Sequence, residues 1–275
     1  MFNYLINSFR RKLARRVTQK HPTEINIFEV AGIGKIKFAN WNNPLVEKKI
    51  ISNDTTDFFK KFLSPGDFSI DIGANIGHTT VQMSLASGAK GLTLGFDPNP
   101  YVYEILSENA GLNPEHTRID ALNLAISEED NEFFYNSSEA SFNKGGISLE
   151  SDNKHGKYAL STKVKGVNLE QFLEKEYPDY LGRLKLIKID TEGYDKEIIR
   201  SISGLLKKYK PVVITECFGK NKPEEKYEQF ELLKELGYSM YYFADFNTNA
   251  EIVPITSKED MLKWKHFDFY AIANG

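Results

Sequence analysis

The alternation of strand-like and helix-like segments over residues 68–236 constrains the fold more than any other feature of the sequence. Short apolar runs with strand character lie at residues 68–72, 91–96, 121–126, 184–189 and 212–216. Helical spacing of apolar residues fills the intervals at residues 77–87, 101–111, 195–208 and 227–236. This order predicts an α/β fold with a mostly parallel sheet and helices on both faces. The runs YSMYYFADF and HFDFYAIAN have no strong helix between them, so we expect an antiparallel strand pair at the C-terminal end of the sheet.

Two segments lie outside this alternation. We expect residues 1–44 to form an extension, made of a basic helix and a β-hairpin built from EINIFEV and GKIKFAN. Residues 45–275 are expected to form one domain, which begins with a helix at 54–63. Within it, residues 128–165 are long and polar and contain two β-like pieces, NEFFYN and YALSTKVKGV. An insertion of this length in a compact domain is usually functional, so we interpret it as a lid over a binding site.

Charge and cysteine content narrow the function classes. The chain has 275 residues, enough for a sizeable core, and its net charge is −3, from 35 Lys and Arg against 38 Asp and Glu. This balance does not favour bulk attraction to nucleic acid, so we expect no nucleic-acid partner. Cys217 is the only cysteine, which excludes an intrachain disulfide and fits a reducing compartment. Since no apolar run approaches the ~18 residues of a membrane-spanning helix, we expect a cytoplasmic protein.

The first twenty residues, MFNYLINSFRRKLARRVTQK, differ from the rest. They contain no acid, and their basic residues are Arg10, Arg11, Lys12, Arg15, Arg16 and Lys20. Apolar residues recur at helical spacing, at Phe2, Leu5, Ile6, Phe9 and Leu13. The apolar part precedes the charges and lacks a small-residue cleavage site, so it is not a secretory signal. Such a helix either packs on the domain with solvated charges or lies on an anionic membrane surface, which would place the protein peripherally at the inner membrane surface.

The stretch FSIDIGANIGHTTV predicts a ligand site where the first core strand becomes a helix. Asp71, Gly73, Asn75 and Gly77 lie where that strand ends, and parallel sheets bind ligands at the carboxyl ends of their strands. Glycine permits a tight turn and close approach of a ligand, and the N–H groups of the next helix face the same point. Asp71 would repel the pyrophosphate that a G-x-G-x-x-G loop binds, but would favour a cationic group. S-adenosyl-L-methionine carries an ammonium, a carboxylate and a sulfonium without phosphate, so we expect it as the cofactor.

The next strands add residues suited to a nucleoside. Asp97 ends the strand GLTLGF, twenty residues after Gly77, where an acid can accept hydrogen bonds from both ribose hydroxyls. Asn99 stands beside it in FDPNP. Ala125, in ALNLAIS, is expected to lie against the adenine.

Acidic residues follow the last two parallel strands. Asp190 and Glu192 lie in KIDTEGYD, and Glu216 ends the strand VVITE. Carboxylates there can orient an acceptor hydroxyl, act as a base or hold a divalent metal, whereas Asp190 could instead cap the next helix. We expect all three acids to serve the acceptor side without a metal, because oxygen clusters of this kind are not diagnostic of one.

Other reactive side chains are less specific. His78 begins the helix after the glycine loop and either touches the ligand or is solvated. His155, in NKHGK, could deprotonate an alcohol from a lid or be an exposed loop residue. Cys217 is expected to be buried and inert, and the aromatic residues of the last strands are expected to be mostly core.

The motifs DIGANIG, GFDPNP, LNLAIS and LIKIDTEGYDKEII together resemble the FkbM family of S-adenosylmethionine-dependent methyltransferases. FFKKFLSPGD and FDFYAIAN extend the resemblance, which covers roughly residues 45–273. The family more often has glutamate where this chain has Asp97, and both acids can bind a ribose. The resemblance implies a Rossmann-like class I methyltransferase fold. It also implies O-methylation of a hydroxyl of a sugar, glycolipid, polysaccharide or polyketide-like small molecule, with residues 128–165 covering that acceptor.

Two other functions compete with this interpretation. An NAD-dependent oxidoreductase would need a third glycine three residues after Gly77, where the chain has Thr80, and would not favour Asp71 near phosphates. A non-catalytic binding protein on a methyltransferase fold is also possible in principle, because a fold does not fix a function. The intact glycine loop and Asp97 argue against it. The residues do not select the acceptor or the oligomeric state.

Overall fold

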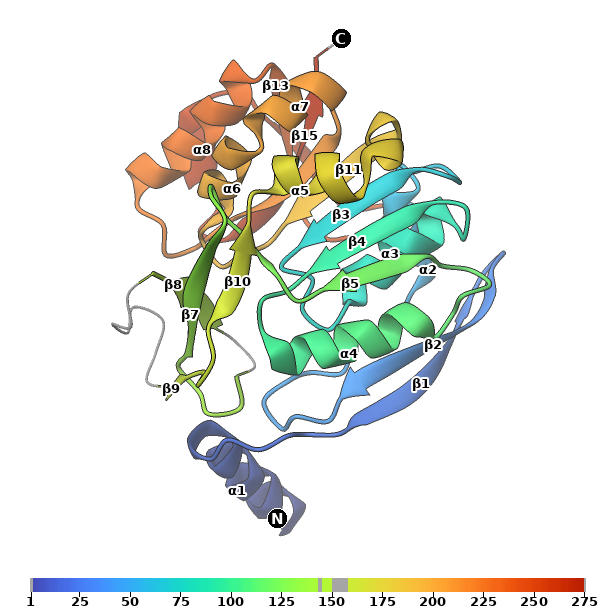
Figure 1. Ribbon diagram of the computed structural model, residues 1–275, viewed down its shortest axis with the longest axis vertical. Coiled ribbons are helices and arrows are strands. Elements are labelled where there is room, and N and C mark those ends of the chain that lie inside the picture. Colours follow the sequence, from blue (N-terminus) through green and yellow to red (C-terminus); the bar gives the residue numbers. More distant parts are fainter. Residues whose placement is uncertain (1, 143–144, 150–157, 275) are drawn as a thin grey trace.

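The computed structural model describes residues 2–142, 145–149 and 158–274, and three β-sheets form within this part of the chain (Figure 1). The largest sheet consists of β3 (Phe68–Ile72), β4 (Leu92–Phe96), β5 (Ile119–Leu122), β11 (Leu184–Ile189), β12 (Val212–Cys217), β13 (Tyr238–Phe243), β14 (Ile252–Ile255) and β15 (Phe267–Ala273). The strand order is β14-β13-β15-β12-β11-β3-β4-β5. β15 runs antiparallel between β12 and β13, whereas β12, β11, β3, β4 and β5 are parallel. This is a Rossmann-like class I methyltransferase sheet, and the predicted C-terminal antiparallel pair, β13 and β15, is confirmed.

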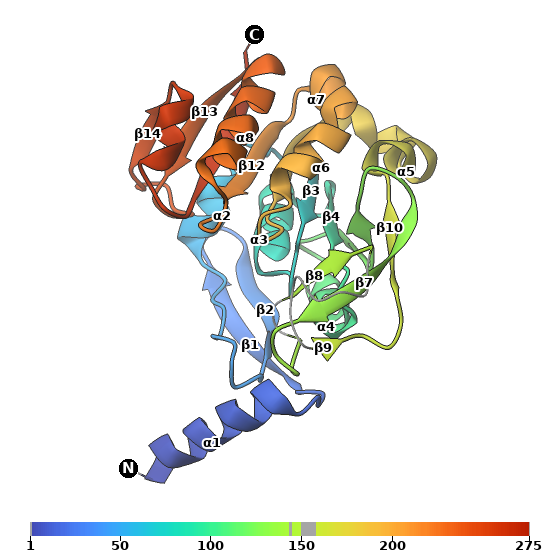
Figure 2. The ribbon, with the colours of Figure 1, turned by 90° about the vertical axis from the view of Figure 1, so that its left-hand side faces the viewer.

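Helices cover both faces of this sheet, as predicted (Figure 2). They are α2 (Asn53–Phe59), α3 (His78–Ser87), α4 (Pro100–Gly111), α5 (Leu169–Glu176), α6 (Asp195–Ser201), α7 (Ser203–Tyr209) and α8 (Pro223–Glu235). One apolar core packs Phe68, Ile70 and Ile72 of β3 against residues of α5 to α8. A second packs Phe58 and Phe59 of α2 on the other face. All five residues of β3 and of β4 are buried, including the polar Ser69 and Thr93, whose hydroxyls hydrogen-bond to each other at 2.9 Å.

One predicted strand and one predicted helix are each divided into two elements in the structure, so these two predictions were wrong. The expected strand at 121–126 is divided between β5 and β6 (Ala125–Ile126), which belong to different sheets. Between them the side-chain amide of Asn123 donates a hydrogen bond to the carbonyl of Asp97 at 2.9 Å, which holds a turn there. The expected helix at 195–208 is divided into α6 and α7, because Ile202 has a non-helical backbone conformation.

The polar insertion at 128–165 contributes most of a second sheet. Its strands are β6, β7 (Asn131–Ser137), β8 (Gly145–Ser148), β9 (Tyr158–Ala159) and β10 (Val164–Val167). They are ordered β6-β10-β7-β8, with β9 also paired to β7. The side chains of Phe133, Tyr135, Phe142 and Val164 form a small apolar core of their own. The alternating pattern of NEFFYN therefore indicates a strand with one buried face.

The N-terminal hairpin packs on α4. It consists of β1 (Thr23–Val30) and β2 (Gly34–Trp41). Asn109, buried in the last turn of α4, accepts a hydrogen bond from the backbone N–H of Ala39 at 2.7 Å. Its side-chain amide donates to the carbonyls of Ala39 and Ile76. One buried asparagine therefore links the hairpin, α4 and the segment after β3.

The first helix, α1 (Phe2–Arg16), extends away from the rest of the molecule (Figure 2). Its C-terminal part contacts the domain, where the N–H of Ala140 donates to the carbonyl of Arg15 and Arg15 Nε lies 3.3 Å from Glu139 Oε1. Within the described residues, no helix has both the length and the apolar character needed to cross a membrane.

Candidate functional site

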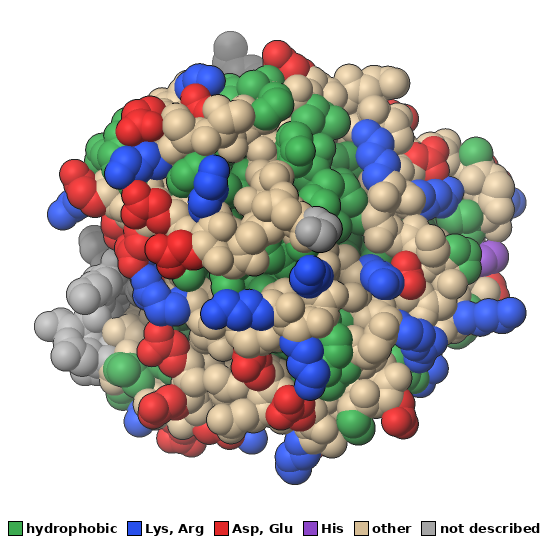
Figure 3. Space-filling model, turned by 90° about the horizontal axis from the view of Figure 1, so that it is seen from above, with side chains coloured by type: hydrophobic (Ala, Val, Ile, Leu, Met, Phe, Trp, Pro, Cys, Tyr) green, Lys and Arg blue, Asp and Glu red, His purple; other side chains and the backbone are tan. Residues whose placement is uncertain are grey.

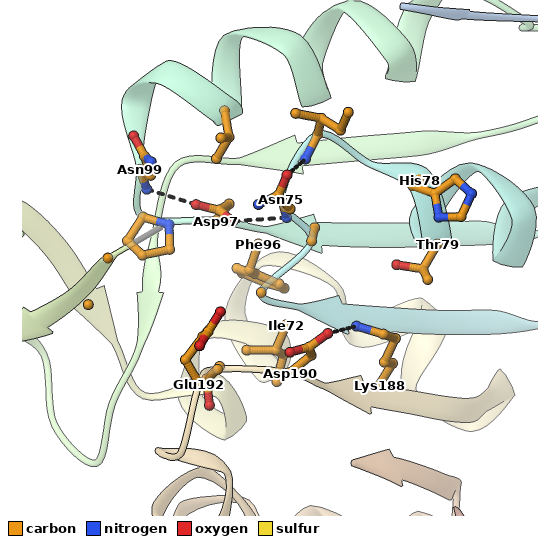
Figure 4. A pocket seen from close by; sticks show the side chains of 18 of the residues that line it. Ile72, Asn75, His78, Thr79, Phe96, Asp97, Asn99, Lys188, Asp190 and Glu192 are labelled. Atoms are coloured by element: carbon orange, nitrogen blue, oxygen red, sulfur yellow. Dashed lines mark hydrogen bonds and ion pairs between the residues drawn. The ribbon is translucent and has the colours of Figure 1, made fainter. Parts of the chain in front are cut away.

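A cavity of about 860 Å³ opens at the carboxyl ends of β3, β4 and β11 (Figure 4). The segments after these strands supply its polar lining, including Gly73, Asn75, Asp97, Asn99 and Asp190. The second sheet closes another side through Ala125, Tyr135 and Ile147. This is the edge where open α/β sheets bind ligands, and the volume suits a cofactor together with an acceptor.

The glycine loop is shaped by contacts that leave no room for side chains. Gly73 has φ +77°, and a Cβ on it would lie 1.9 Å from the carbonyl oxygen of Asp190. Gly77 has φ +87°, and a Cβ there would lie 2.8 Å from Leu106 Cδ1. The N–H groups of Gly73 and Ala74 both donate to the carbonyl of Phe96, at 3.0 and 2.9 Å. The loop therefore joins the ends of β3, β4 and β11 around one cavity wall.

Asp97 is held at the cavity by backbone hydrogen bonds. One carboxylate oxygen accepts from the N–H of Asn75 and the other from the N–H of Asn99, each at 2.9 Å (Figure 4). The residue is only 7% exposed. Burial raises the pKa of Asp97 to about 7, although these two N–H groups act in the opposite direction. A buried acid with lone pairs still available at the cavity suits a ligand that supplies further hydrogen-bond donors.

Asp71 is placed differently from the expectation. Its carboxylate is fully buried and does not line the cavity. One oxygen accepts from Thr79 Oγ1 and Thr80 Oγ1, at 2.7 and 2.6 Å, and the other lies 3.3 Å from Lys188 Nζ. The prediction that Asp71 attracts a cationic group directly is therefore not supported by its position. Asp71 instead ties the start of α3 to β11 below the loop.

Lys188 is the partner that sequence reasoning missed. It lies inside the buried strand β11, directly beside Asp71 in the register with β3, and its Nζ is 3.2 Å from Asp190 Oδ2. Burial disfavours its charge, but the adjacent Asp190 and Asp71 carboxylates raise the pKa of Lys188 above its usual value. Lys185 and Lys188 both interrupt the apolar pattern of this strand, but Lys185 is exposed whereas Lys188 is buried, and buried charges are almost always paired.

Asp190 and Glu192 line the cavity across from Asp97 (Figure 4). Asp190 does not cap the next helix, because the N-cap of α6 is Tyr194. Lys188 holds one oxygen of Asp190, and Glu192 has the left-handed conformation with φ +55°. A positive φ is uncommon for a residue other than glycine and places this acid on a sharp turn at the cavity wall.

Glu216 lies outside the cavity lining, unlike the other two expected acceptor acids. Its Oε1 is 2.9 Å from His266 Nε2, and its Oε2 has no hydrogen-bond partner among the described residues. Burial, together with the nearby Asp190, Asp195 and Asp268, raises the pKa of Glu216 to about 9. A direct role for Glu216 at the acceptor is therefore not supported by its position.

The remaining candidates fall at the edge of the site or beyond it. Asn99 lines the cavity and also caps α4, since its Oδ1 accepts from the N–H of Tyr101. His78 lines the cavity with Nε2 2.9 Å from the carbonyl of Ile50, and burial lowers its pKa. Cys217 is buried, as expected. His155 lies outside the described residues. In the described ranges, no group of three or more His, Cys, Asp or Glu side chains is arranged to hold a metal ion.

The residues present fit S-adenosylmethionine at the glycine-loop side of the cavity. The backbone of Gly73 offers an approach that a Cβ would obstruct, and Asp97 offers a buried carboxylate to a pair of hydroxyl donors. Ala125 and Ile126 supply small and apolar surface beside them. Tyr135 completes this wall from the second sheet, a contribution that the sequence pattern of the insertion did not indicate.

Comparison with known proteins gives a consistent identification. The model of the "Methyltransferase FkbM domain" family matches residues 71–240, more than half of the chain. The curated "Methyltransferase sdnD" of Sordaria araneosa is 27% identical over an alignment of 161 residues, which covers 51% of this chain and 62% of that protein.

Two solved structures resemble the chain at low identity. A methyltransferase FkbM from Methylobacillus flagellatus matches with a TM-score of 0.46 and 8% identity, over 79% of this chain and 50% of that one. A SAM-dependent O-methyltransferase from Thermotoga maritima matches with a TM-score of 0.44 and 15% identity, over 92% and 78%. From the family match, which spans the glycine loop, Asp97, Asp190 and Glu192, the chain belongs to the FkbM methyltransferase domain family.

Proposed function

We propose that this chain uses S-adenosylmethionine to methylate a hydroxyl oxygen of a sugar, glycolipid, polysaccharide or polyketide-like small molecule. The observation that carries the proposal is that carboxylate side chains lie on two opposite walls of one cavity. Asp97 stands at the end of β4, and Asp190 and Glu192 follow β11. The first wall suits a nucleoside and the second suits a hydroxyl acceptor.

On the cofactor side, the proposed contacts follow from the polar groups present. Asp97 would accept hydrogen bonds from the ribose hydroxyls, and Asn75 and Asn99 would hold its carboxylate in place. Gly73 would permit close approach of the cofactor backbone, while Ala125 would pack against the adenine. Gly77 and Asp71 would act indirectly, since Gly77 starts α3 and Asp71 holds the beginning of that helix.

On the acceptor side, Asp190 is our candidate base and Glu192 our candidate orienting residue. When bound, S-adenosylmethionine supplies an activated methyl group. Asp190 would take the hydroxyl proton as the oxygen–carbon bond forms and the carbon–sulfur bond breaks. Lys188 fixes the Asp190 carboxylate through Oδ2, and the walls from the second sheet limit access of water. Much of the rate acceleration would come from alignment of the reacting atoms, because the sulfonium is already electrophilic.

Calorimetry with S-adenosylmethionine, S-adenosylhomocysteine and NAD tests the cofactor. We expect binding of the two adenosyl compounds and none of NAD. Asp97→Asn removes a negative acceptor and should weaken cofactor binding by about 10-fold to 100-fold. Asp57→Asn, at an exposed acid of α2 outside the cavity, is the matched control and should bind normally. Equal affinity of Asp97→Asn and the unchanged chain would remove the ribose assignment.

Incorporation of a labelled methyl group from S-adenosylmethionine into a cell extract tests the reaction. Mass spectrometry should find a product heavier by one methyl group. Asp190→Asn should keep cofactor affinity within about threefold while lowering turnover by about 10²-fold to 10⁴-fold. Cofactor binding without any methylated product would favour a non-catalytic binding protein instead.

A further inference from the structure

We propose that α1 and the adjoining rim of the cavity dock on an anionic membrane surface, so that the cavity receives a hydroxyl acceptor carried by a lipid. The choice of acceptor rests on the proposed function, whereas the docking surface does not. We define the docking surface by Phe9, Leu13, Ile50 and Leu149, together with the basic residues of α1.

Phe9 and Leu13, two large apolar residues of α1, are exposed to solvent rather than packed on the domain. Ala14 is fully buried, whereas Phe9 is 66% exposed and Leu13 is 38% exposed. Successive residues of an α-helix are rotated by about 100°, which places Ala14 about 140° from Phe9 around the helix axis. The helix therefore contacts the domain through a small residue and leaves large apolar side chains without cover. This excludes, for Phe9 and Leu13, the expected alternative in which the apolar face packs on the domain.

The same helix concentrates positive charge. Its basic residues are Arg10, Arg11, Lys12, Arg15 and Arg16, and it contains no acid. Residues 1–20 carry six basic residues while the whole chain has net charge −3, so the remainder carries −9. On the face opposite α1, acidic and basic side chains are interspersed (Figure 3). An anionic surface would therefore attract the molecule at α1 and favour one orientation.

The exposed apolar residues adjoin the cavity rather than a remote face. Arg11 of α1 lines the cavity that also contains Asp97 and Asp190. Ile50, 64% exposed, follows the lining residue Lys49. Leu149, 62% exposed, lies two residues after the lining residue Ile147. Three separate segments thus carry a large exposed apolar side chain within two residues, along the chain, of a residue that lines the cavity.

A bilayer surface matches this combination better than a nucleic acid does. Phosphates of a nucleic acid would satisfy the arginines and lysines but would leave Phe9 and Leu13 in water. The interface of an anionic membrane accepts both, because apolar side chains enter the acyl boundary while cations remain among the headgroups. A lipid-linked hydroxyl acceptor would then be presented at the cavity rim.

Vesicle flotation of the full chain tests the docking surface. Phosphatidylcholine vesicles with 30% phosphatidylglycerol should carry the protein at low salt, whereas pure phosphatidylcholine should not. A triple variant, R10Q with K12Q and R16Q, should bind on the order of a hundredfold more weakly, since each cation near such a surface contributes on the order of fivefold.

Phe9→Ser with Leu13→Ser should weaken binding by at least about tenfold. Ile25→Ser with Ile27→Ser removes exposed apolar residues of β1 and is the matched control, with unchanged flotation expected.

Several outcomes would overturn this inference. They are equal recovery with both vesicle types, no loss in the charge variant, or tighter binding to duplex DNA than to the anionic vesicles. Self-association that Phe9→Ser with Leu13→Ser abolishes would assign the apolar face to a second copy instead. Calorimetry with S-adenosylmethionine on the same preparations separates the two proposals. Normal cofactor binding without flotation refutes docking alone, and flotation without cofactor binding refutes the proposed function alone.

Discussion

At the scale of single residues, Asp97 should couple cofactor binding to pH. Burial raises its pKa to about 7, above the usual value of 3.8. Ribose hydroxyls donate to the ionised carboxylate, so binding should be strongest above about pH 7. Affinity should fall by up to about tenfold per unit below that pH as the acid takes up a proton. Calorimetry between pH 5.5 and 8.5 checks this, and Asp97→Asn should show a flat profile. A wild-type affinity independent of pH would contradict the assignment.

A second residue-scale prediction concerns Gly73. Gly73→Ala should lower the free energy of unfolding by about 3 kcal/mol or more, because its Cβ meets the carbonyl of Asp190 at 1.9 Å in addition to the strain of a positive φ. Gly32→Ala is the matched control, since Gly32 has φ +76°, close to the +77° of Gly73, but nothing within 4 Å of a Cβ. It should cost about 1–2 kcal/mol from backbone strain alone. Urea unfolding of both variants measures the difference, and equal losses would show that the contact with Asp190 does not matter.

The sequence correctly predicted cavity-lining residues where the position of the backbone alone brings the residue to the cavity. Gly73, Asn75 and Asp97 line the cavity because they follow strands whose carboxyl ends share one edge of the sheet. Asp71 occupies the same kind of position, yet its side chain turns to Lys188. That direction depends on a neighbouring strand 117 residues later in the chain, which periodicity within one segment does not indicate.

At the scale of elements, the insertion of β15 beside β12 should make stability depend on pH. The register places Glu216 directly opposite Asp268, and like charges in that position disfavour ionisation of both. Burial first, and then nearby carboxylates, raise the pKa of Glu216 to about 9 and that of Asp268 to about 6. The folded state therefore holds a proton on Glu216 that the unfolded chain releases near pH 4.5.

Because the folded pKa is the higher one, stability should fall as pH rises through about 9. Between pH 6 and pH 9 the unchanged chain should lose up to about 4 kcal/mol more unfolding free energy than Glu216→Gln, which cannot ionise. Asp268 titrates mainly below this window, and Asp97 is present in both proteins. Denaturant titrations at pH 6, 7.5 and 9 measure the slopes. Glu231→Gln, at an exposed acid paired with Lys258, should behave like the unchanged chain. Parallel slopes for Glu216→Gln and the unchanged chain would refute the raised pKa.

Element boundaries were predictable where the chain carries its own signals. β3 and β11 have the predicted bounds, because apolar residues recur within each strand and Gly73 or Asp190 follows it directly. The division at Asn123 depends on a hydrogen bond to the carbonyl of Asp97, a contact between separate segments. Pairing of β6 with β10 likewise joins residues about forty positions apart, so local patterns could not assign β6 to the second sheet.

At the scale of the whole molecule, the topology combines predictable and unpredictable parts. Alternation of strands and helices indicated the parallel sheet and its two helical layers. It did not indicate that the last strand, β15, enters between β12 and β13, or that the polar insertion forms a sheet on the cavity wall. Both features are long-range pairings. The second places Tyr135 and Ile147 on the cavity wall, whereas the first pairs Glu216 with Asp268 outside the cavity lining.

Residues of both sheets line one cavity. A cofactor bound there should therefore raise the free energy of unfolding of the whole domain. At a concentration 100 times its dissociation constant, S-adenosylmethionine should add about 2.7 kcal/mol to the unfolding free energy. For a chain of this size that corresponds to a rise in melting temperature of roughly 5–10 °C. NAD at the same concentration should leave the melting temperature unchanged, and Asp97→Asn should show a smaller rise with S-adenosylmethionine. Scanning calorimetry measures all three. A rise with NAD alone would favour an oxidoreductase, because stabilisation follows the ligand that binds the folded state.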